Sequence, residues 1–219
     1  MRIKLLILFV FISLLGFAQN LVINPSFEDT ISCISWPGWP QMQCSYWIWG
    51  NGGSPDYFNL NYCGGANVPN NQFGYQFAKT GAAYCGLALY LTPMVQPNGR
   101  EYLGGQLNDT LKQGHTYCVS FYVAKADSSW YYTSSIGMYL SQNSSVDYST
   151  ALNLPYTPQI VNTNGIIYDF ISRCRAFWRL ASVTSSPLNI FAISTTLSSA
   201  ERVFILDCAI PFSICLKTK

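Results

Sequence analysis

The sequence predicts an all-β sandwich, and three observations support this prediction. Strand-like segments are short, are bounded by Gly, Pro, Asn or Ser, and show neither a helical heptad nor a fixed-period repeat. Residues 116–124 alternate in the way that is typical of a central strand. Aromatic residues make up 16% of the chain and charged residues only 10%, a composition typical of a secreted β-sandwich rather than a helical enzyme.

The expected strands follow in order along the chain. Residues 21–23 form the first, and residues 30–75 are expected to be mostly long loops, because they are dense in Trp, Pro, Gly and Asn. Strands are next expected at 82–90 and 101–103, with a strand edge at 107–111 that ends in a turn at 112–114. After the central strand, further strands are expected at 135–141 and 203–207. Strands that are separated by turns, without helices, favour a sandwich.

The first eighteen residues predict an export signal. Residues 1–4 are basic, residues 5–17 are apolar but too short for a comfortable membrane span, and Gly16 and Ala18 are the small residues that a signal peptidase reads. We expect cleavage after Ala18 and a single mature domain over residues 19–219. No later apolar run predicts a transmembrane segment. We therefore expect the protein in the outer membrane, at the cell surface or outside the cell.

Charge and motifs limit the functions that this chain can have. Removal of Arg2 and Lys4 with the signal leaves ten basic residues of twelve, against ten acidic ones, which argues against a nucleic-acid partner. The sequence has one histidine, His115, and contains neither a Gly-x-Ser-x-Gly elbow nor a His-Glu-x-x-His motif. We therefore predict a protein that is not an enzyme.

Eight cysteines in an exported chain suggest disulfides. Eight cysteines allow 105 complete pairings, so the sequence does not give the connectivity. A local bridge among Cys33, Cys44 and Cys63 is the first expectation, because these residues share one loop-rich segment. Cys85 and Cys118 lie in strand-like segments and are expected to be buried thiols. A metal–thiolate site is the weaker alternative, since the chain has no Cys-x-x-Cys pair.

The composition changes after Gly165, which is the last of the sixteen glycines. The 54 residues that follow carry six basic and three acidic residues and three of the eight cysteines. A β-sandwich normally continues to need glycine at its turns. Three interpretations stay open: closing strands with unusual turns, a degenerate segment, or a shifted reading frame.

An ordered set of short motifs resembles a known family. The set comprises Asn24-Pro-Ser-Phe-Glu28, Ser54-Pro-Asp-Tyr-Phe-Asn59, Val68-Pro-Asn70, Gly74-Tyr-Gln76, Gly81-Ala-Ala-Tyr-Cys-Gly-Leu87, Arg100-Glu-Tyr-Leu103, Leu107 to Leu111, Gly114-His-Thr-Tyr117, Phe121-Tyr-Val123 and Ala126-Asp-Ser128. It resembles bacterial envelope proteins with an N-terminal galactose-binding-like jelly roll, which often continue into an outer-membrane-protein-A-like or a sorting domain. The resemblance covers residues 20–165 and implies a jelly-roll β-sandwich. The chain departs from the family pattern after Gly165, and from the sequence we expect no such downstream domain in it.

The resemblance also implies a structural calcium ion. In similar carbohydrate-binding jelly rolls a Glu after the first strand, here Glu28, ligates the ion together with a late-strand Asp, here Asp207. Hard oxygen ligands from opposite chain ends suit Ca²⁺. The alternative is that Glu28 only accepts hydrogen bonds in a turn.

Loop aromatics are the candidate ligand-binding residues. Exposed rings in loops can stack on sugars, and polar neighbours can bind sugar hydroxyls. The candidate set is Trp36, Trp39, Trp47, Trp49, Asn51, Asp56 and Tyr57. The alternative is that these rings pack inside their loops, and Trp130-Tyr-Tyr132 poses the same choice.

These features predict an exported, non-catalytic module that binds a glycan or an envelope polysaccharide. A structural or adhesive surface protein is the first alternative. A glycoside-active enzyme with a carboxylate pair among Glu28, Asp56, Glu101 and Asp127 is the second.

Overall fold

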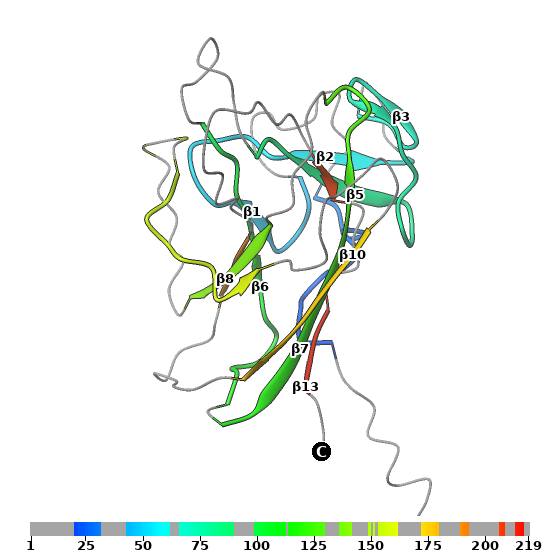
Figure 1. Ribbon diagram of the computed structural model, residues 1–219. Coiled ribbons are helices and arrows are strands. Elements are labelled where there is room, and N and C mark those ends of the chain that lie inside the picture. Colours follow the sequence, from blue (N-terminus) through cyan, green and yellow to red (C-terminus); the bar gives the residue numbers. More distant parts are fainter. Residues whose placement is uncertain are drawn as a thin grey trace, which may run out of the picture.

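The computed structural model shows a β-sandwich (Figure 1). It describes residues 20–31, 43–61, 66–89, 99–112, 114–129, 136–141, 149, 151 and 153–161, together with the backbone of the strands 172–179, 189–192, 206–208 and 213–216. Within these ranges every regular element is a strand. In the same part of the chain, no helix is long and apolar enough to cross a membrane. The expected export signal, residues 1–18, lies outside the described residues and stays a prediction.

Two antiparallel sheets form the two layers of the sandwich. The first has the order β1 (Trp47–Trp49), β6 (Leu103–Gln106), β11 (Asn189–Ala192), β8 (Gly137–Ser141) and β9 (Ile160–Val161). The second has the order β10 (Ser172–Arg179), β7 (Thr116–Lys125), β12 (Leu206–Cys208), β5 (Ala83–Leu87) and β2 (Asp56–Asn59), and β13 (Ser213–Leu216) also pairs with β7. A small hairpin, β3 (Asn70–Asn71) and β4 (Gly74–Tyr75), completes the described strands.

The chain changes sheet at almost every step, as a jelly roll does. From β5 it crosses to β6, returns to β7 and crosses again to β8; later it passes from β10 to β11 and back to β12. Every pairing between named strands is antiparallel. The predicted all-β, jelly-roll sandwich is therefore confirmed.

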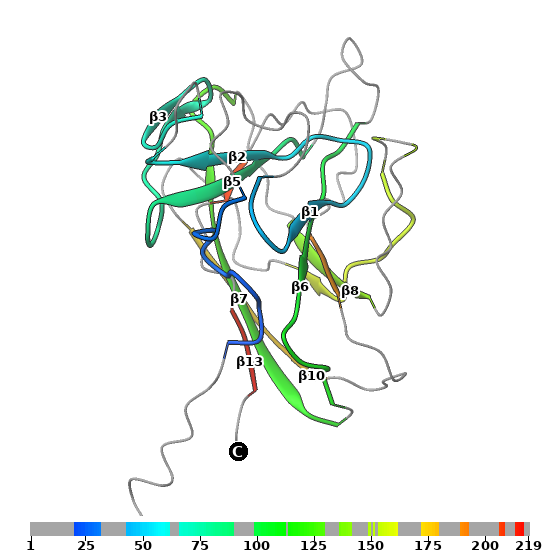
Figure 2. The ribbon, with the colours of Figure 1, turned by 180° about the vertical axis from the view of Figure 1, so that it is seen from behind.

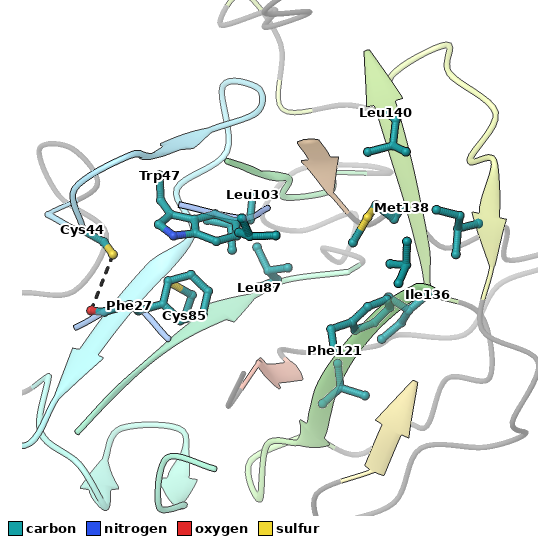
Figure 3. Packing of buried hydrophobic residues seen from close by; sticks show 14 of the residues in the cluster. Phe27, Cys44, Trp47, Cys85, Leu87, Leu103, Phe121, Ile136, Met138 and Leu140 are labelled. Carbon is teal, nitrogen blue, oxygen red and sulfur yellow. Dashed lines mark hydrogen bonds between the residues drawn. The ribbon is translucent and has the colours of Figure 1, made fainter. Parts of the chain in front are cut away.

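The hydrophobic core lies between the two sheets (Figure 3). In β7 the core residues alternate along the strand: Tyr117, Val119, Phe121 and Val123. This is the period of two that predicted the strand from sequence. The opposite sheet adds Leu103, Met138 and Leu140 to the same cluster. Burial of these side chains is the main stabilising contribution to a sandwich of this kind.

The structure corrects one sequence-based expectation about strands and adds short strands to another region. Residues 21–23 form a single bridge, Val22 to Leu107, rather than a strand, because Asn24 adopts a left-handed φ of 47° and Pro25 follows it. Figure 2 shows this N-terminal segment, in blue, running toward β5. The region 30–75, expected to be mostly loops, contributes β1, β2 and the β3–β4 hairpin. Its aromatic residues fit a buried strand as well as a loop.

The segment after Gly165 contributes strands to both sheets. β11 lies between β6 and β8, and β12 lies between β5 and β7. Each of these two strands therefore joins two other strands into one sheet. This is the arrangement that closing strands adopt. Of the late strand expected at 203–207, the structure describes residues 206 and 207, which lie in Leu206–Cys208.

Candidate functional site

The structure buries two of the aromatic residues that were expected to bind a ligand. Trp47 is 2% exposed and Tyr57 is 1% exposed, and both belong to the core cluster. The Trp47 ring packs on Phe27 with a centroid distance of 4.6 Å, and its indole Nε1 donates to the Asn24 carbonyl at 2.8 Å. The Tyr57 hydroxyl donates to the Phe27 carbonyl at 2.8 Å. Rings with almost no exposed surface cannot stack on a sugar, so the packing alternative holds for these two.

The remaining candidates that the structure describes are buried or half-buried. Trp49 is half-buried and packs against the core cluster. Its indole N–H is buried and has no hydrogen-bond partner among the described residues. Asn51 is fully buried: its Nδ2 donates to the Arg100 carbonyl at 2.7 Å, and its Oδ1 accepts from the Gly53 N–H at 3.1 Å. Asp56 is half-buried in β2. Trp36, Trp39 and Trp130-Tyr-Tyr132 lie outside the described residues.

The Asn-Pro-Ser-Phe-Glu motif forms a buried hydrogen-bond network. The Asn24 amide donates to the carbonyls of Asp29 and Ser45 and to the Cys44 sulfur, and the Asn24 Oδ1 accepts from the Asp29 N–H. The Cys44 thiol donates in turn to the Phe27 carbonyl at 3.7 Å (Figure 3). Burial raises the pKa of this thiol well above its usual range. Cys44 is a buried thiol in the structure. Because Cys33 and Cys63 lie outside the described residues, the local disulfide expected among these three cysteines stays a prediction.

Glu28 contacts the backbone just before β5. Both of its carboxylate oxygens accept from the Ala82 N–H, at 3.0 and 3.1 Å, across from Gly81, whose φ is +69°. Asp207 occupies a register position in β12 opposite Gly86 and Ala124. Among the described side chains no group of three His, Cys, Asp or Glu could hold a metal ion. The calcium site at Glu28 and Asp207 therefore stays a prediction.

Glu101 is a buried carboxylate with a structural role. It accepts from the Ala88 N–H at 2.7 Å and from the Ser54 N–H at 3.1 Å, and so ties the end of β5 to the loop before β2. Burial raises the pKa of this group, while these hydrogen bonds lower it. Three of the four carboxylates considered for hydrolysis thus bind three different backbone segments: Glu28 at Ala82, Glu101 at Ala88 and Asp127 at Tyr75.

Two exposed aromatic residues on the β3–β4 hairpin form the candidate site, which we call the aromatic pair. Tyr75 is 62% exposed and Phe77 is 56% exposed. Their rings contact each other edge to face, with a centroid distance of 5.6 Å and an interplanar angle of 90°. The hairpin lies at one end of the sandwich, beyond β2 and β5 (Figure 1). The two rings therefore form a small contiguous apolar surface in solvent.

The hairpin that carries the pair is anchored on the outer face of the six-stranded sheet. Phe73 packs edge to face on Phe58 at 5.8 Å, within a second small cluster that also contains Tyr84. The Asn71 amide donates to the Tyr84 hydroxyl at 2.6 Å, and the Phe73 carbonyl accepts from the Ser128 N–H at 3.0 Å. In the run of residues 73–77, these contacts turn the Phe73 side chain toward the sheet. The side chains of Tyr75 and Phe77 stay in solvent.

Asp127 fixes the backbone directly beneath the pair. Its Oδ2 accepts from the Tyr75 N–H at 2.8 Å. Gly74 has a φ of +144° and lies so close to Asp127 that a Cβ on Gly74 would clash with this carboxylate. The Tyr75 ring is therefore presented by a backbone with little freedom, which lowers the entropy cost of binding.

Polar residues share the hairpin segment with the aromatic pair. The exposed residues Asn70 and Gln72 belong to the same hairpin, and the Gln76 amide donates to the Phe77 carbonyl at 2.7 Å. Sequence reasoning missed this site because Phe73, Tyr75 and Phe77 look alike in the sequence. The signal that was available is the aromatic run itself, in a Gly- and Asn-rich segment directly after Pro69.

The chain has no match among protein-family models or curated proteins. Among solved structures it is similar to a carbohydrate-binding module of the CBM4 type, with a TM-score of 0.42 and 11% identity over 88% of this chain and 99% of that one. A second is the N-terminal CBM22-1–CBM22-2 tandem domain of Paenibacillus barcinonensis Xyn10C, with a TM-score of 0.45 and 11% identity over 87% and 46%. A third is the enzymatically active domain of bacteriophage CBA120 tailspike protein 4, with a TM-score of 0.41 and 11% identity over 89% and 21%.

Proposed function

We propose that this protein is an exported, non-catalytic module that binds a glycan, and that the aromatic pair is its sugar-stacking surface. The observation that supports this most directly is the exposure of Tyr75 and Phe77 on an anchored hairpin. An aromatic face attracts the C–H groups of a sugar ring, and the polar side chains around it can exchange hydrogen bonds with the hydroxyls. Export and an envelope polysaccharide as ligand belong to this proposal.

The geometry favours a neutral sugar that contacts the aromatic pair with one or two of its own rings. The two ring planes are perpendicular, so one sugar can stack on one face while a neighbouring unit meets the edge of the other ring. Contacts of this size give an affinity in the micromolar to millimolar range, or about 4–8 kcal/mol.

The test is a glycan array, followed by a titration of the best ligand with single variants. Tyr75→Ala and Phe77→Ala should each weaken binding by about tenfold, roughly 1.4 kcal/mol. Both should leave the melting temperature nearly unchanged, because substitutions of exposed side chains cost little stability. The matched control is Leu60→Ala, which removes a side chain that is equally exposed, at 55%, but lies in the turn after β2.

Two results would contradict the proposal. One is a ligand whose affinity is the same for the wild type and for both pair variants. The other is an array without any signal combined with capture of a protein partner that requires the same two rings, which would instead support the structural or adhesive alternative.

A further inference from the structure

The strand register sets four of the eight cysteines opposite one another in two pairs. In the β5–β12 ladder Cys85 is the register partner of Cys208. In the β7–β13 ladder Cys118 is the register partner of Cys215. Cysteines make up eight of 219 residues, so chance rarely sets two of them opposite each other, and here it happens twice.

The backbone spacing of such positions suits a disulfide. Directly opposed residues of antiparallel strands have Cα atoms about 4.5 or 5.5 Å apart, and a disulfide needs a Cα separation of about 4.4–6.8 Å. The Cβ atoms of opposed residues lie about 4.5–5.5 Å apart, and a disulfide brings them to about 3.8 Å. An approach of about 0.7–1.7 Å between the Cβ atoms is therefore enough to close such a pair.

The sheet separates one pair from the other. Cys85 belongs to the core cluster between the two layers. Cys118 lies between Tyr117 and Val119, which are both core residues, and therefore occupies the opposite face of the sheet. Register partners share a face. Each cysteine thus has its own partner on its own face, and an exchange of partners would have to cross the sheet.

We propose that Cys85–Cys208 and Cys118–Cys215 are disulfides in the exported protein. Cys85 and Cys118 are both buried. In each pair two S–H bonds are lost and one S–S bond forms. The two electrons and two protons pass to an external disulfide, which is reduced to two thiols.

The consequence is a covalent link between the late strands and the strands that precede Gly165. The bridges join β12 to β5 and β13 to β7, and they close segments of 123 and 97 residue positions. Loops of this length lose the most entropy in the unfolded chain when they are closed. The short strands β12 and β13 are the elements that such a link should stabilise most.

The test is peptide mapping of the full chain, purified from an oxidising compartment or refolded with reduced and oxidised glutathione. After alkylation of remaining thiols, digestion without reduction should yield a linked peptide that contains Cys85 and Cys208 and another that contains Cys118 and Cys215. Reduction should then lower the melting temperature by about 10 °C or more. The mapping uses the wild type, so it does not depend on whether a variant folds.

The variants Cys208→Ala and Cys215→Ala should each remove one linked peptide and reduce the effect of reductant on the melting temperature. The matched control is Cys174→Ala, because Cys174 lies in β10 opposite Phe121 rather than opposite a cysteine. This change should leave both linked peptides in place. Alkylation of all four cysteines in the oxidised protein, or linkage of Cys85 to Cys118, would overturn the proposal.

Discussion

Trp47 and Tyr75 show how two similar residues differ in role. Trp47 is enclosed by Phe27 and by the backbone of Gly105, and its N–H is satisfied by the Asn24 carbonyl. Tyr75 contacts Phe77 and otherwise faces solvent. Truncation of a buried ring costs about 3–5 kcal/mol of folding free energy, whereas truncation of an exposed ring removes mainly binding surface. Composition alone does not distinguish the two cases, because both residues lie among Gly, Pro and Asn.

Glu101 gives a prediction about pH at the scale of one residue. Burial raises the pKa of its carboxyl group in the folded protein above the ordinary value of 4.5. Between these two pKa values the folded protein binds more protons than the unfolded chain. The free energy of unfolding should therefore fall as the pH rises above about 4.5, with a slope of at most about 1.4 kcal/mol per pH unit.

Denaturant unfolding of the wild type and of Glu101→Gln between pH 4 and pH 8 measures this contribution. The variant should lack this part of the slope, because its amide does not titrate. Identical pH profiles for the wild type and Glu101→Gln would show that this carboxyl group is not buried as described.

At the scale of elements, the contact between β1 and β6 depends on a glycine. A Cβ on Gly105 would lie 2.7 Å from the six-membered ring of Trp47, its register partner. Gly105→Ala should therefore destabilise the protein by about 1–3 kcal/mol, or roughly 2–4 °C in melting temperature per kcal/mol for a chain of this size.

A double-mutant cycle checks the cause of this effect. In a Trp47→Leu background the large ring is absent, so Gly105→Ala should cost clearly less than it does in the wild type. If Gly105→Ala destabilised the protein equally in both backgrounds, the glycine would be needed for the backbone conformation of β6 rather than for its packing against Trp47.

Some elements could be predicted from the sequence, and others could not. The strand at 116–124 was predicted almost to its ends, because β7 buries one face and its residues alternate. The strand expected at 101–103 lies instead at Leu103–Gln106, and Glu101 and Tyr102, just before it, bond through both backbone and side chain to other segments. β1 and β2 were missed since buried aromatic strands between Pro and Gly resemble ordered loops. The candidate site was missed because the inward turn of Phe73 depends on contacts with Phe58, a distant part of the chain.

At the scale of the whole molecule, the two sheets and the hairpin have separate roles. The sandwich buries one continuous core, and the hairpin is held on its outer face by a second, smaller cluster. The strands after Gly165 lie within both sheets, so a truncation there would remove inner strands. Substitutions at the aromatic pair should therefore leave the core unchanged.

The most direct test of glycan binding at the aromatic pair is an NMR titration of the folded protein with the best ligand from the array. We expect the largest shift changes at the ring protons of Tyr75 and Phe77 and at the amides of residues 74–77, with the Trp47 indole N–H unchanged. Saturable shifts that centre on another surface, with the hairpin unaffected, would contradict the account.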